Sequence, residues 1–128
     1  MKKTDVVKRG DIWWCNFAGG VGSEQNDLRP SVIVSNSMCN THSSVVTVVP
    51  LTTATKTRLP CHVKLDKSDC DGLERPSTAL CEQVRTVDKE RIKDRVGYVK
   101  SRSMRCINEA LATQLSLTVD LFHGFSFR

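Results

Sequence analysis

The sequence has no long apolar run, since none approaches the ~18 consecutive residues that a membrane-spanning helix needs. Its N-terminus, MKKTDVVKRG, carries basic residues but lacks the apolar core of a secretory signal peptide. Internal repeats, low-complexity tracts and linker-like segments are also missing. We therefore expect a cytoplasmic protein with no membrane partner, folded as one domain over residues 1–128, a length that suffices to bury a core.

Common catalytic motifs are absent as well. The chain has no GxSxG, HExxH, Walker loop or dinucleotide-binding fingerprint. Cys61 and His62 are adjacent in a strand-like segment, where their side chains point to opposite faces and cannot pair with each other. His62 is accordingly expected on the surface or in a cross-strand contact.

Cysteines number six, but no two have CxxC spacing and none is grouped with a histidine at metal-ligand spacing. Without a secretory signal, a disulfide framework is not expected. We expect reduced, structural thiols at Cys15, Cys39, Cys61, Cys70, Cys81 and Cys106.

The charge of the chain is unevenly distributed. The net charge is +5 and the pI is about 9.0. Between Arg85 and Arg105, eight Lys or Arg residues occur with three acidic residues, a surplus of five that equals the whole net charge. Such a segment suits a polyanion such as nucleic acid, or an acidic protein. The alternative is an ordinary salt-bridged surface, because Asp88, Glu90 and Asp94 interleave with the basic residues.

Short strands dominate the predicted secondary structure. Apolar–polar alternation and β-branched residues predict strands over residues 11–17, 31–36, 45–51, 59–65, 78–87 and 95–99. Between them we expect a polar loop over 18–28, a polar turn over 36–44, an acidic turn over 66–74 and a helical turn over 88–92. Together with one C-terminal helix, these strands predict a mostly β fold, a small antiparallel barrel or curled sheet.

The predicted helix covers residues 101–119, with Ser101 or Ser103 as its cap. Its apolar residues recur every three or four positions, at Met104, Ile107, Leu111, Leu115 and Val119. The tail beyond it holds Phe122, Phe125 and Phe127, which we expect to pack on the body of the domain or on another subunit.

Two predicted strand ends carry conspicuous polar residues. The loop over 18–28 is long for a hairpin connection, and it ends in Arg29 and Pro30, where an apolar strand begins. Pro50 cannot donate to a ladder, so Thr52 and Thr53 fall at a strand end, where side chains can face a cleft. Either a solvated turn or an anion-binding site would account for this arrangement.

Five fragments, taken in order and at their spacing, resemble the MazF/PemK family of bacterial toxins. They are KRGDIWWCNF, GSEQNDLRPSVIVSN, VVPLTT, LPCHVKL and CEQVRTVDKERI, and the resemblance covers roughly residues 8 to 118. It implies a small SH3-like barrel with a C-terminal helix, a homodimer, and neutralisation by a cognate acidic antitoxin of the MazE type. It further implies a ribosome-independent endoribonuclease that needs no metal or other cofactor.

The implied reaction is cleavage of single-stranded RNA at a short sequence. The ribose 2′-OH attacks the adjacent phosphate and leaves a 2′,3′-cyclic phosphate and a 5′-OH. The family's catalytic arginine, threonine and loop acid match Arg29, Thr52 and Glu24. A guanidinium is a planar, bidentate and permanently charged clamp for phosphate oxygens, and such a donor in a partly dry cleft contributes ~3–4 kcal/mol.

The resemblance leaves roles open at several positions. Arg29 is a poor base because a guanidinium keeps its proton in proteins, so we expect it to stabilise charge and to donate a proton. Glu24 is our candidate to accept the 2′-OH proton, and the alternative is a carboxylate that holds Arg29 in place or caps nearby amides. Trp14 is expected on the cleft side, where stacking contributes ~1–3 kcal/mol per base, and the alternative is a core position. Gln83 is expected to read a base edge or to make a cross-strand hydrogen bond.

The remaining implied substrate-binding residues are Ser23, Gln25, Thr53 and Glu82. The segments NSMCNTHSS and TATKTR have no distinctive match in the family, so the RNA sequence that is recognised is not predicted. Two other functions fit the same fold, which does not by itself determine activity. One is a non-cleaving toxin that inhibits DNA gyrase by binding it, and the other is a plain RNA-binding SH3-like module that uses the basic segment from Arg85 to Arg105.

Overall fold

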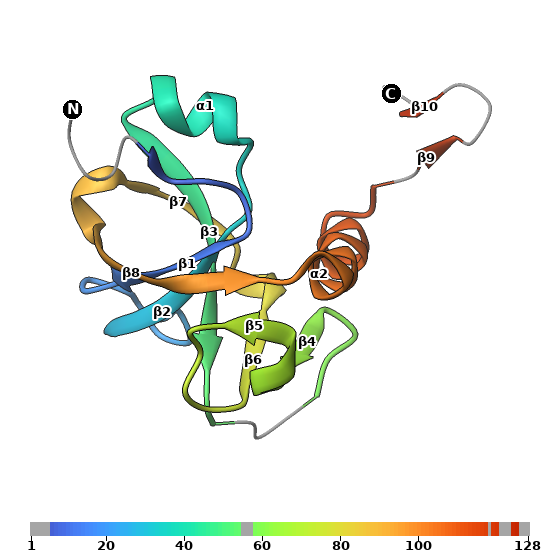
Figure 1. Cartoon of the computed structure of the whole chain (residues 1–128), viewed down its shortest axis with the longest axis horizontal. Helices are drawn as coiled ribbons and strands as arrows, with labels where there is room; N and C mark the ends of the chain where they lie inside the picture. Colours follow the sequence, from blue (N-terminus) through green and yellow to red (C-terminus); the bar gives the residue numbers. More distant parts are fainter. Residues whose placement is uncertain (1–5, 55–57, 118, 121–123, 126–128) are drawn as a thin grey trace.

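A computed structural model describes residues 6–54, 58–117, 119–120 and 124–125, with side chains for 6–54 and 58–117 (Figure 1). The strands are β1 (Asp11–Asn16), β2 (Leu28–Ile33), β3 (Val45–Thr52), β4 (His62–Leu65), β5 (Cys70–Asp71), β6 (Ser77–Leu80), β7 (Arg85–Asp88), β8 (Ile92–Val99), β9 (Val119–Asp120) and β10 (Gly124–Phe125). The helices are α1 (Ser37–His42) and α2 (Ser101–Gln114), with the 3-10 turns η2 (Lys67–Asp69), η3 (Cys81–Gln83) and η4 (Lys89–Arg91). Within these ranges, no helix is both long and apolar enough to cross a membrane.

Eight of the strands form one antiparallel sheet. Its order is β4-β6-β3-β2-β1-β8-β5, and β7 also pairs with β3. The sheet curls into an almost closed barrel with α2 against one side (Figure 1). This architecture confirms the predicted mostly β, SH3-like antiparallel barrel with a C-terminal helix.

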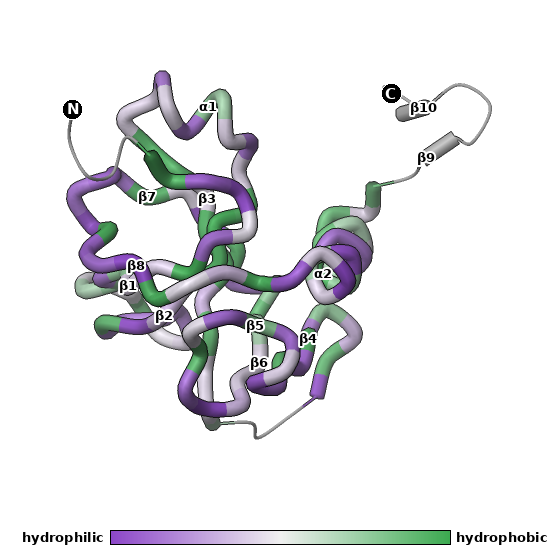
Figure 2. Tube along the Cα trace, in the orientation of Figure 1, coloured by the Kyte–Doolittle hydropathy of each residue, from purple (hydrophilic) through white to green (hydrophobic). Residues whose placement is uncertain are grey.

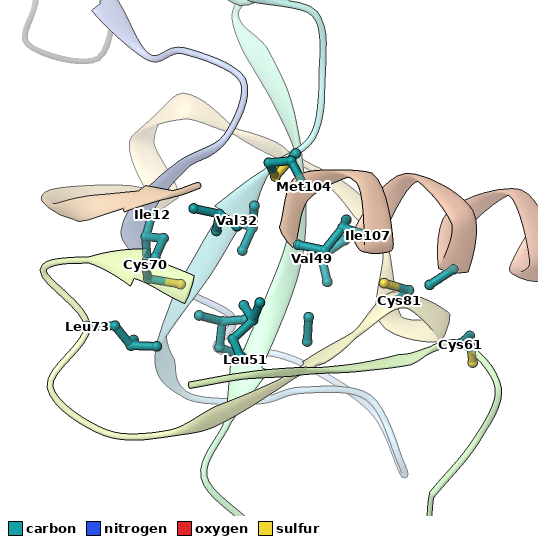
Figure 3. Packing of buried hydrophobic residues seen from close by; sticks show 14 residues of the cluster. Ile12, Val32, Val49, Leu51, Cys61, Cys70, Leu73, Cys81, Met104 and Ile107 are labelled. Carbon is teal, nitrogen blue, oxygen red and sulfur yellow. The ribbon is translucent and has the colours of Figure 1, made fainter. Parts of the chain in front are cut away.

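The central strand β3 is buried on both faces, which explains its continuous apolar run. Val46 and Val48 point into one core, whereas Val49 and Leu51 point into a second core beneath α2. Met104 and Ile107 of α2 reach toward the sheet in this second core (Figure 3). Figure 2 shows the apolar interior strands beside a hydrophilic junction between β8 and α2.

The first core holds Trp13 and Cys15 of β1. Its buried members are Val7, Trp13, Cys15, Phe17, Ile33, Val46, Val48, Val87 and Ile92. The alternation predicted for β1 is therefore confirmed, since Trp13 is 2% exposed and Trp14 is 38% exposed. Four of the six cysteines, among them Cys15, are buried, and all six are free thiols, as predicted.

The predicted strand over 78–87 is wrong, because η3 divides it into β6 and β7. Both strands pair with the same side of β3, but β6 pairs with Leu51 and Thr52 while β7 pairs with Val45 to Val48. Pro50, which lies between the two paired stretches, has no N–H to donate to a ladder. The chain leaves the sheet at this point and closes η3 with a hydrogen bond from the Val84 amide to the Cys81 carbonyl.

The predicted polar turn over 36–44 contains a helix, α1. The side chain of Asn36 accepts hydrogen bonds from the amides of Met38 and Cys39, which caps its first turn. Other boundaries differ by a few residues. β2 covers 28–33 and not 31–36, β4 begins at 62 and not 59, β8 begins at 92 and not 95, and the acidic turn over 66–74 contains η2 and β5.

Helix α2 is shorter than predicted and is capped differently. Its N-cap is Lys100, without a side-chain cap, and the hydroxyl of Ser103 instead donates to Asp69 at 2.9 Å. The helix ends because Ser116 adopts a left-handed φ of 54°. The amides of Ser116 and Leu117 then donate to the carbonyls of Thr113 and Ala112, in the pattern of a Schellman motif.

Beyond α2, the short strands β9 and β10 pair only with each other in the described part of the chain. Phe122 and Phe127 of the predicted phenylalanine cluster lie outside the described residues, and for Phe125 only the backbone, in β10, is described.

Candidate functional site

Strand register places Arg29 beside Thr52. β2 and β3 pair with Ser31 opposite Pro50 and Val32 opposite Val49, and the same register continued outward sets Arg29 opposite Thr52. Residues directly opposite in an antiparallel pair share one face of the sheet, so the two side chains lie together. The Arg29 Nη1 donates to Thr52 Oγ1 at 3.1 Å.

The hydroxyl of Thr52 is buried but not fully committed. Its Oγ1 accepts from the Ala54 amide at 3.2 Å, and the Ala54 carbonyl, the acceptor for its proton, is 3.4 Å away. That second distance makes a weak hydrogen bond. The Thr52 proton is therefore available to a better acceptor, such as a phosphate oxygen.

The guanidinium of Arg29 is also held by Asp27, a residue that the sequence did not single out. Asp27 Oδ1 accepts from Nε at 2.5 Å and Oδ2 accepts from Nη2 at 3.3 Å, which is a two-pronged ion pair. The Arg29 side chain is 28% exposed, and the end of its guanidinium between Nη1 and Nη2 is left for a ligand. The sequence feature that could have identified Asp27 is its position two residues before Arg29, because residues i and i+2 of an extended segment lie on the same side.

The connection between β1 and β2 is internally bonded. The amides of Gly19 and Gly20 both donate to Asn26 Oδ1 at 2.9 Å. A Cβ on Gly20 would lie 2.3 Å from the Gln25 carbonyl oxygen, so only glycine fits there. Arg91 Nη1 donates to the carbonyl of Asn16 at 2.9 Å, which fixes the start of the connection to the turn before β8.

Within this loop, Ser23 and Glu24 are exposed and Gln25 is half-buried. The carboxylate of Glu24 has no hydrogen-bond or ionic partner among the described residues. The alternative role considered for it, holding Arg29 in place, falls to Asp27 instead. Gln83 donates from Nε2 to the Ser23 carbonyl at 3.1 Å, so the structure brings Gln83 to the loop and not to a neighbouring strand.

Glu82 points away from the loop, toward β4. Its Oε2 lies 2.7 Å from His62 Nε2, and its Oε1 lies 3.9 Å from the Cys61 thiol. Because His62 Nδ1 accepts from the Leu59 amide, the neutral ring carries its proton on Nε2 and donates it to Glu82. The side chain of His62 therefore contacts the 3-10 turn η3 and not a side chain of a neighbouring strand, and the Glu82 carboxylate is occupied.

Trp14 is exposed but does not share the face of Arg29. It pairs with Pro30, while Cys15 pairs with Arg29, so alternation directs Trp14 to the opposite side of the sheet. Thr53 is exposed next to Thr52. The structure therefore brings together Arg29 and Thr52, and separately Ser23 and Gln83, but not Trp14 or Glu82.

Positive charge surrounds the strand that carries Arg29. Burial raises the pKa of the Cys15 thiol to about 11, and Arg85, Arg91 and Lys93 partly oppose that shift through their charges. The thiol directly opposite Arg29 is hence protonated at neutral pH and is not a nucleophile. Arg85 also stacks over the Phe17 ring at 5.5 Å, near the start of the loop. Across the described residues, no group of three or more His, Cys, Asp or Glu is placed to hold a metal ion.

Comparison with known proteins gives matches over most of the chain. A family model described as PemK-like, MazF-like toxin of type II toxin–antitoxin system matches residues 8–115. Endoribonuclease EndoA of Bacillus subtilis is 37% identical over 113 residues, which cover 88% of this chain and 97% of that protein. Endoribonuclease MazF of Staphylococcus saprophyticus is 35% identical, over 88% of this chain and 93% of that protein.

Solved structures share the fold. A mycobacterial endoribonuclease in complex with its cognate antitoxin is 32% identical with a TM-score of 0.73, over 89% of this chain and 99% of that chain. MazF from Deinococcus radiodurans has a TM-score of 0.76 at 22% identity, over 87% of this chain and 97% of that chain, which is a likeness of fold alone.

Proposed function

The chain belongs to the family of PemK-like, MazF-like toxins of type II toxin–antitoxin systems and is an endoribonuclease, and from that premise we propose its substrate, its chemistry and its assembly. The substrate is single-stranded mRNA, cleaved at a short sequence without ribosomes and without a metal. The protein acts in the cytoplasm as a homodimer of single-domain subunits, and a cognate acidic antitoxin binds and inhibits it. The antitoxin complex of the mycobacterial relative supports this last part.

The observation that carries the proposed chemistry is the contact between Arg29 and Thr52. Both side chains sit at strand ends on one face of the sheet, with 3.1 Å between Nη1 and Oγ1. A phosphate at this point accepts hydrogen bonds from the free end of the guanidinium and from the Thr52 hydroxyl. Charge that grows on its non-bridging oxygens is stabilised by donors that are already in position.

The reaction is an internal transesterification. The 2′ oxygen bonds to phosphorus while the bond from phosphorus to the 5′ oxygen breaks, giving a 2′,3′-cyclic phosphate and a free 5′-OH. Glu24 takes the proton of the 2′-OH, a role that suits a carboxylate with no partner among the described residues. Arg29 or water protonates the leaving 5′ oxygen. Glu24 then releases the proton that it accepted to solvent and the donor regains one, so no atom is gained or lost overall.

In the proposed site, Ser23, Gln25 and Thr53 contact the RNA near the scissile phosphate. Gln83 positions the loop through its bond to the Ser23 carbonyl and presents its amide oxygen to a base edge. Trp14, which is exposed on the other face of β1, and Glu82, which is paired with His62, contact the RNA farther from the scissile phosphate.

The decisive experiment removes the Arg29 side chain. Arg29→Ala should lower kcat by about 10²- to 10³-fold, the cost of losing a charge-stabilising donor, and should abolish toxicity on expression. Cleavage of a long RNA in EDTA, with chemical identification of the fragment ends, measures both the activity and the chemistry. Circular dichroism checks that the variant is folded.

Three results would contradict the proposal. Undiminished cleavage by folded Arg29→Ala would remove that residue from the mechanism. Fragments with 5′-phosphate ends would exclude the cyclising reaction. Intact RNA with a gel shift from the wild-type chain would indicate a binding module.

A further inference from the structure

A second positively charged surface lies at the opposite end of β1 from Arg29. Two adjoining cavities, each of about 410 Å³, open among the N-terminal segment, β1, β8 and the first turns of α2. Lys8, Asp11 and Arg95 line both cavities. We call the combined surface the basic groove, and its charged and aromatic residues are Lys8, Arg9, Asp11, Trp13, Arg95, Tyr98 and Arg105.

Two cations of the basic groove are uncommitted. Lys8 and Arg105 are exposed, and neither side chain has a hydrogen-bond or ionic partner in the described ranges. Arg9 is different, because its Nε donates to the Val34 carbonyl and its Nη2 to Asn108. No described residue therefore neutralises the side-chain charges of Lys8 and Arg105, and these charges face the groove.

The acid of the basic groove is neutralised from within the protein. Asp11 is buried and accepts from the Lys8 amide at 3.0 Å, from the Trp13 indole at 3.3 Å and from Arg95 Nη2 at 3.3 Å. Its carboxylate is thus fully satisfied and does not face the groove as a free anion. The surface offered to a ligand is cationic.

An aromatic ring accompanies these charges. Tyr98 is 44% exposed, and the Arg95 guanidinium lies over its ring with 6.0 Å between Cζ and the ring centroid. Planar arginine and tyrosine surfaces beside free cations are the combination on which unpaired bases stack while phosphates are neutralised. Carboxylates of an acidic peptide would use the cations but not the ring.

On these grounds we propose that the basic groove binds single-stranded RNA outside the cleaved bond, as an extension of the substrate path. The inference rests on the proposed ribonuclease function. Asp11 and Cys15 are four residues apart on β1, and Cys15 is opposite Arg29, so the groove lies about 13 Å from the catalytic register along the strand. An RNA dinucleotide, which holds only the scissile phosphate, reaches Arg29 but not the groove.

The test compares long and short RNA. In an Arg29→Ala background, which removes cleavage from the measurement, Lys8→Glu/Arg105→Glu should weaken binding of a single-stranded RNA of about 30 nucleotides by tenfold or more. The slope of log K against log salt should become shallower by about 1.4, because each lost phosphate contact on a single strand contributes about 0.7. Binding of an RNA dinucleotide should be unchanged, because it is too short to reach the groove from Arg29.

The matched control is Lys67→Glu/Arg75→Glu, which makes the same change in net charge at two exposed residues outside the basic groove. Equal loss of long-RNA binding in the groove and control variants would overturn the proposal. It would also be overturned by groove-dependent binding of a polyglutamate peptide with unchanged RNA binding, or by a change in sedimentation mass, which would identify a protein interface.

Failure of the proposed ribonuclease function is distinguishable. A wild-type chain that cuts no RNA but shows groove-dependent RNA binding contradicts the proposed function and supports the groove. A chain that cuts RNA, and whose RNA binding does not depend on the groove, supports the proposed function and contradicts the groove.

Discussion

Arg29 is fixed from two directions before any substrate arrives. Asp27 holds its Nε and Nη2, and Thr52 accepts from its Nη1. A long side chain that is already ordered loses little conformational entropy when it binds a phosphate. The ion pair with Asp27 also offsets part of the positive charge of Arg29. Asp27 therefore orients the guanidinium but weakens its attraction for a phosphate.

At the residue scale, we expect the orienting effect of Asp27 on Arg29 to outweigh the loss of attraction for the phosphate. Asp27→Ala should lower kcat by about tenfold, or ~1.4 kcal/mol, because the guanidinium becomes free to leave Thr52. Asp27→Asn keeps an acceptor and should recover part of that loss. Steady-state kinetics that separate kcat from KM make the measurement, with Asp71→Ala as an exposed carboxylate control. A higher kcat in Asp27→Ala would show that Asp27 competes with the phosphate.

Ser31 gives a residue-scale prediction about stability. Its hydroxyl is fully buried and has no hydrogen-bond partner within the described residues. Ser31→Ala should raise the free energy of unfolding by about 1 kcal/mol, since an unsatisfied buried hydroxyl is removed. Urea denaturation measures it. Ser77→Ala is the control with the opposite expected sign. The Ser77 hydroxyl donates to the Arg75 carbonyl, so the loss of this hydrogen bond should lower the free energy of unfolding. A destabilised Ser31→Ala would contradict this account.

At the scale of elements, local sequence patterns predicted those features of the fold that depend only on residues close together in the sequence. The apolar run of β3, the alternation in β1 and the period of α2 all follow from which side chains must be buried, and each element exists. The break between β6 and β7 depends on how Pro50 is paired, which is a long-range property. The end of α2 depends on Ser116 entering a left-handed conformation that glycine would have signalled.

The candidate site was likewise predicted only in part from the sequence. Arg29, Thr52 and Glu24 were identified by resemblance, and the structure brings the first two into contact. Asp27 was missed because its role depends on side-chain rotamers, and Glu82 was misplaced because its partner His62 comes from the register of β4 with β6. Trp14 was assigned to the cleft, but the pairing of β1 with β2 directs it to the other face.

The buried thiols of Cys15, Cys70 and Cys81 predict a loss of stability at alkaline pH. Burial raises the pKa of Cys81 from 9.0 to about 12, and those of Cys15 and Cys70 to about 11. Above pH 9 the unfolded chain loses thiol protons that the folded chain retains, so the free energy of unfolding falls as the pH rises toward 11–12. Below pH 9 these groups have no effect.

Urea denaturation at several pH values should show this fall. Cys81→Ala should make it shallower by up to ~1.4 kcal/mol per pH unit, the contribution of one proton. Cys39 and Cys106 are exposed, so the double variant Cys39→Ser/Cys106→Ser should leave the slope unchanged. Equal slopes in wild type and Cys81→Ala would refute the assignment.

For the whole molecule, the proposed homodimer predicts a sedimentation mass of about twice the 14.3 kDa chain. The measurement is best made on Arg29→Ala, because we expect the loss of activity to permit expression while the dimer stays intact. A variant without the C-terminal segment from 119 onward tests whether that segment contributes to the dimer. A concentration-independent mass of one chain for Arg29→Ala would contradict the dimer.

The register that joins β2 to β3 has a consequence for the activity of this toxin. Arg29 and Thr52 share a face only while Ser31 stays opposite Pro50, and a slip of one residue would send their side chains to opposite sides of the sheet. A chain in the slipped register would lack the proposed catalytic pair, so the pairing of these two strands would decide whether a folded copy can cut RNA.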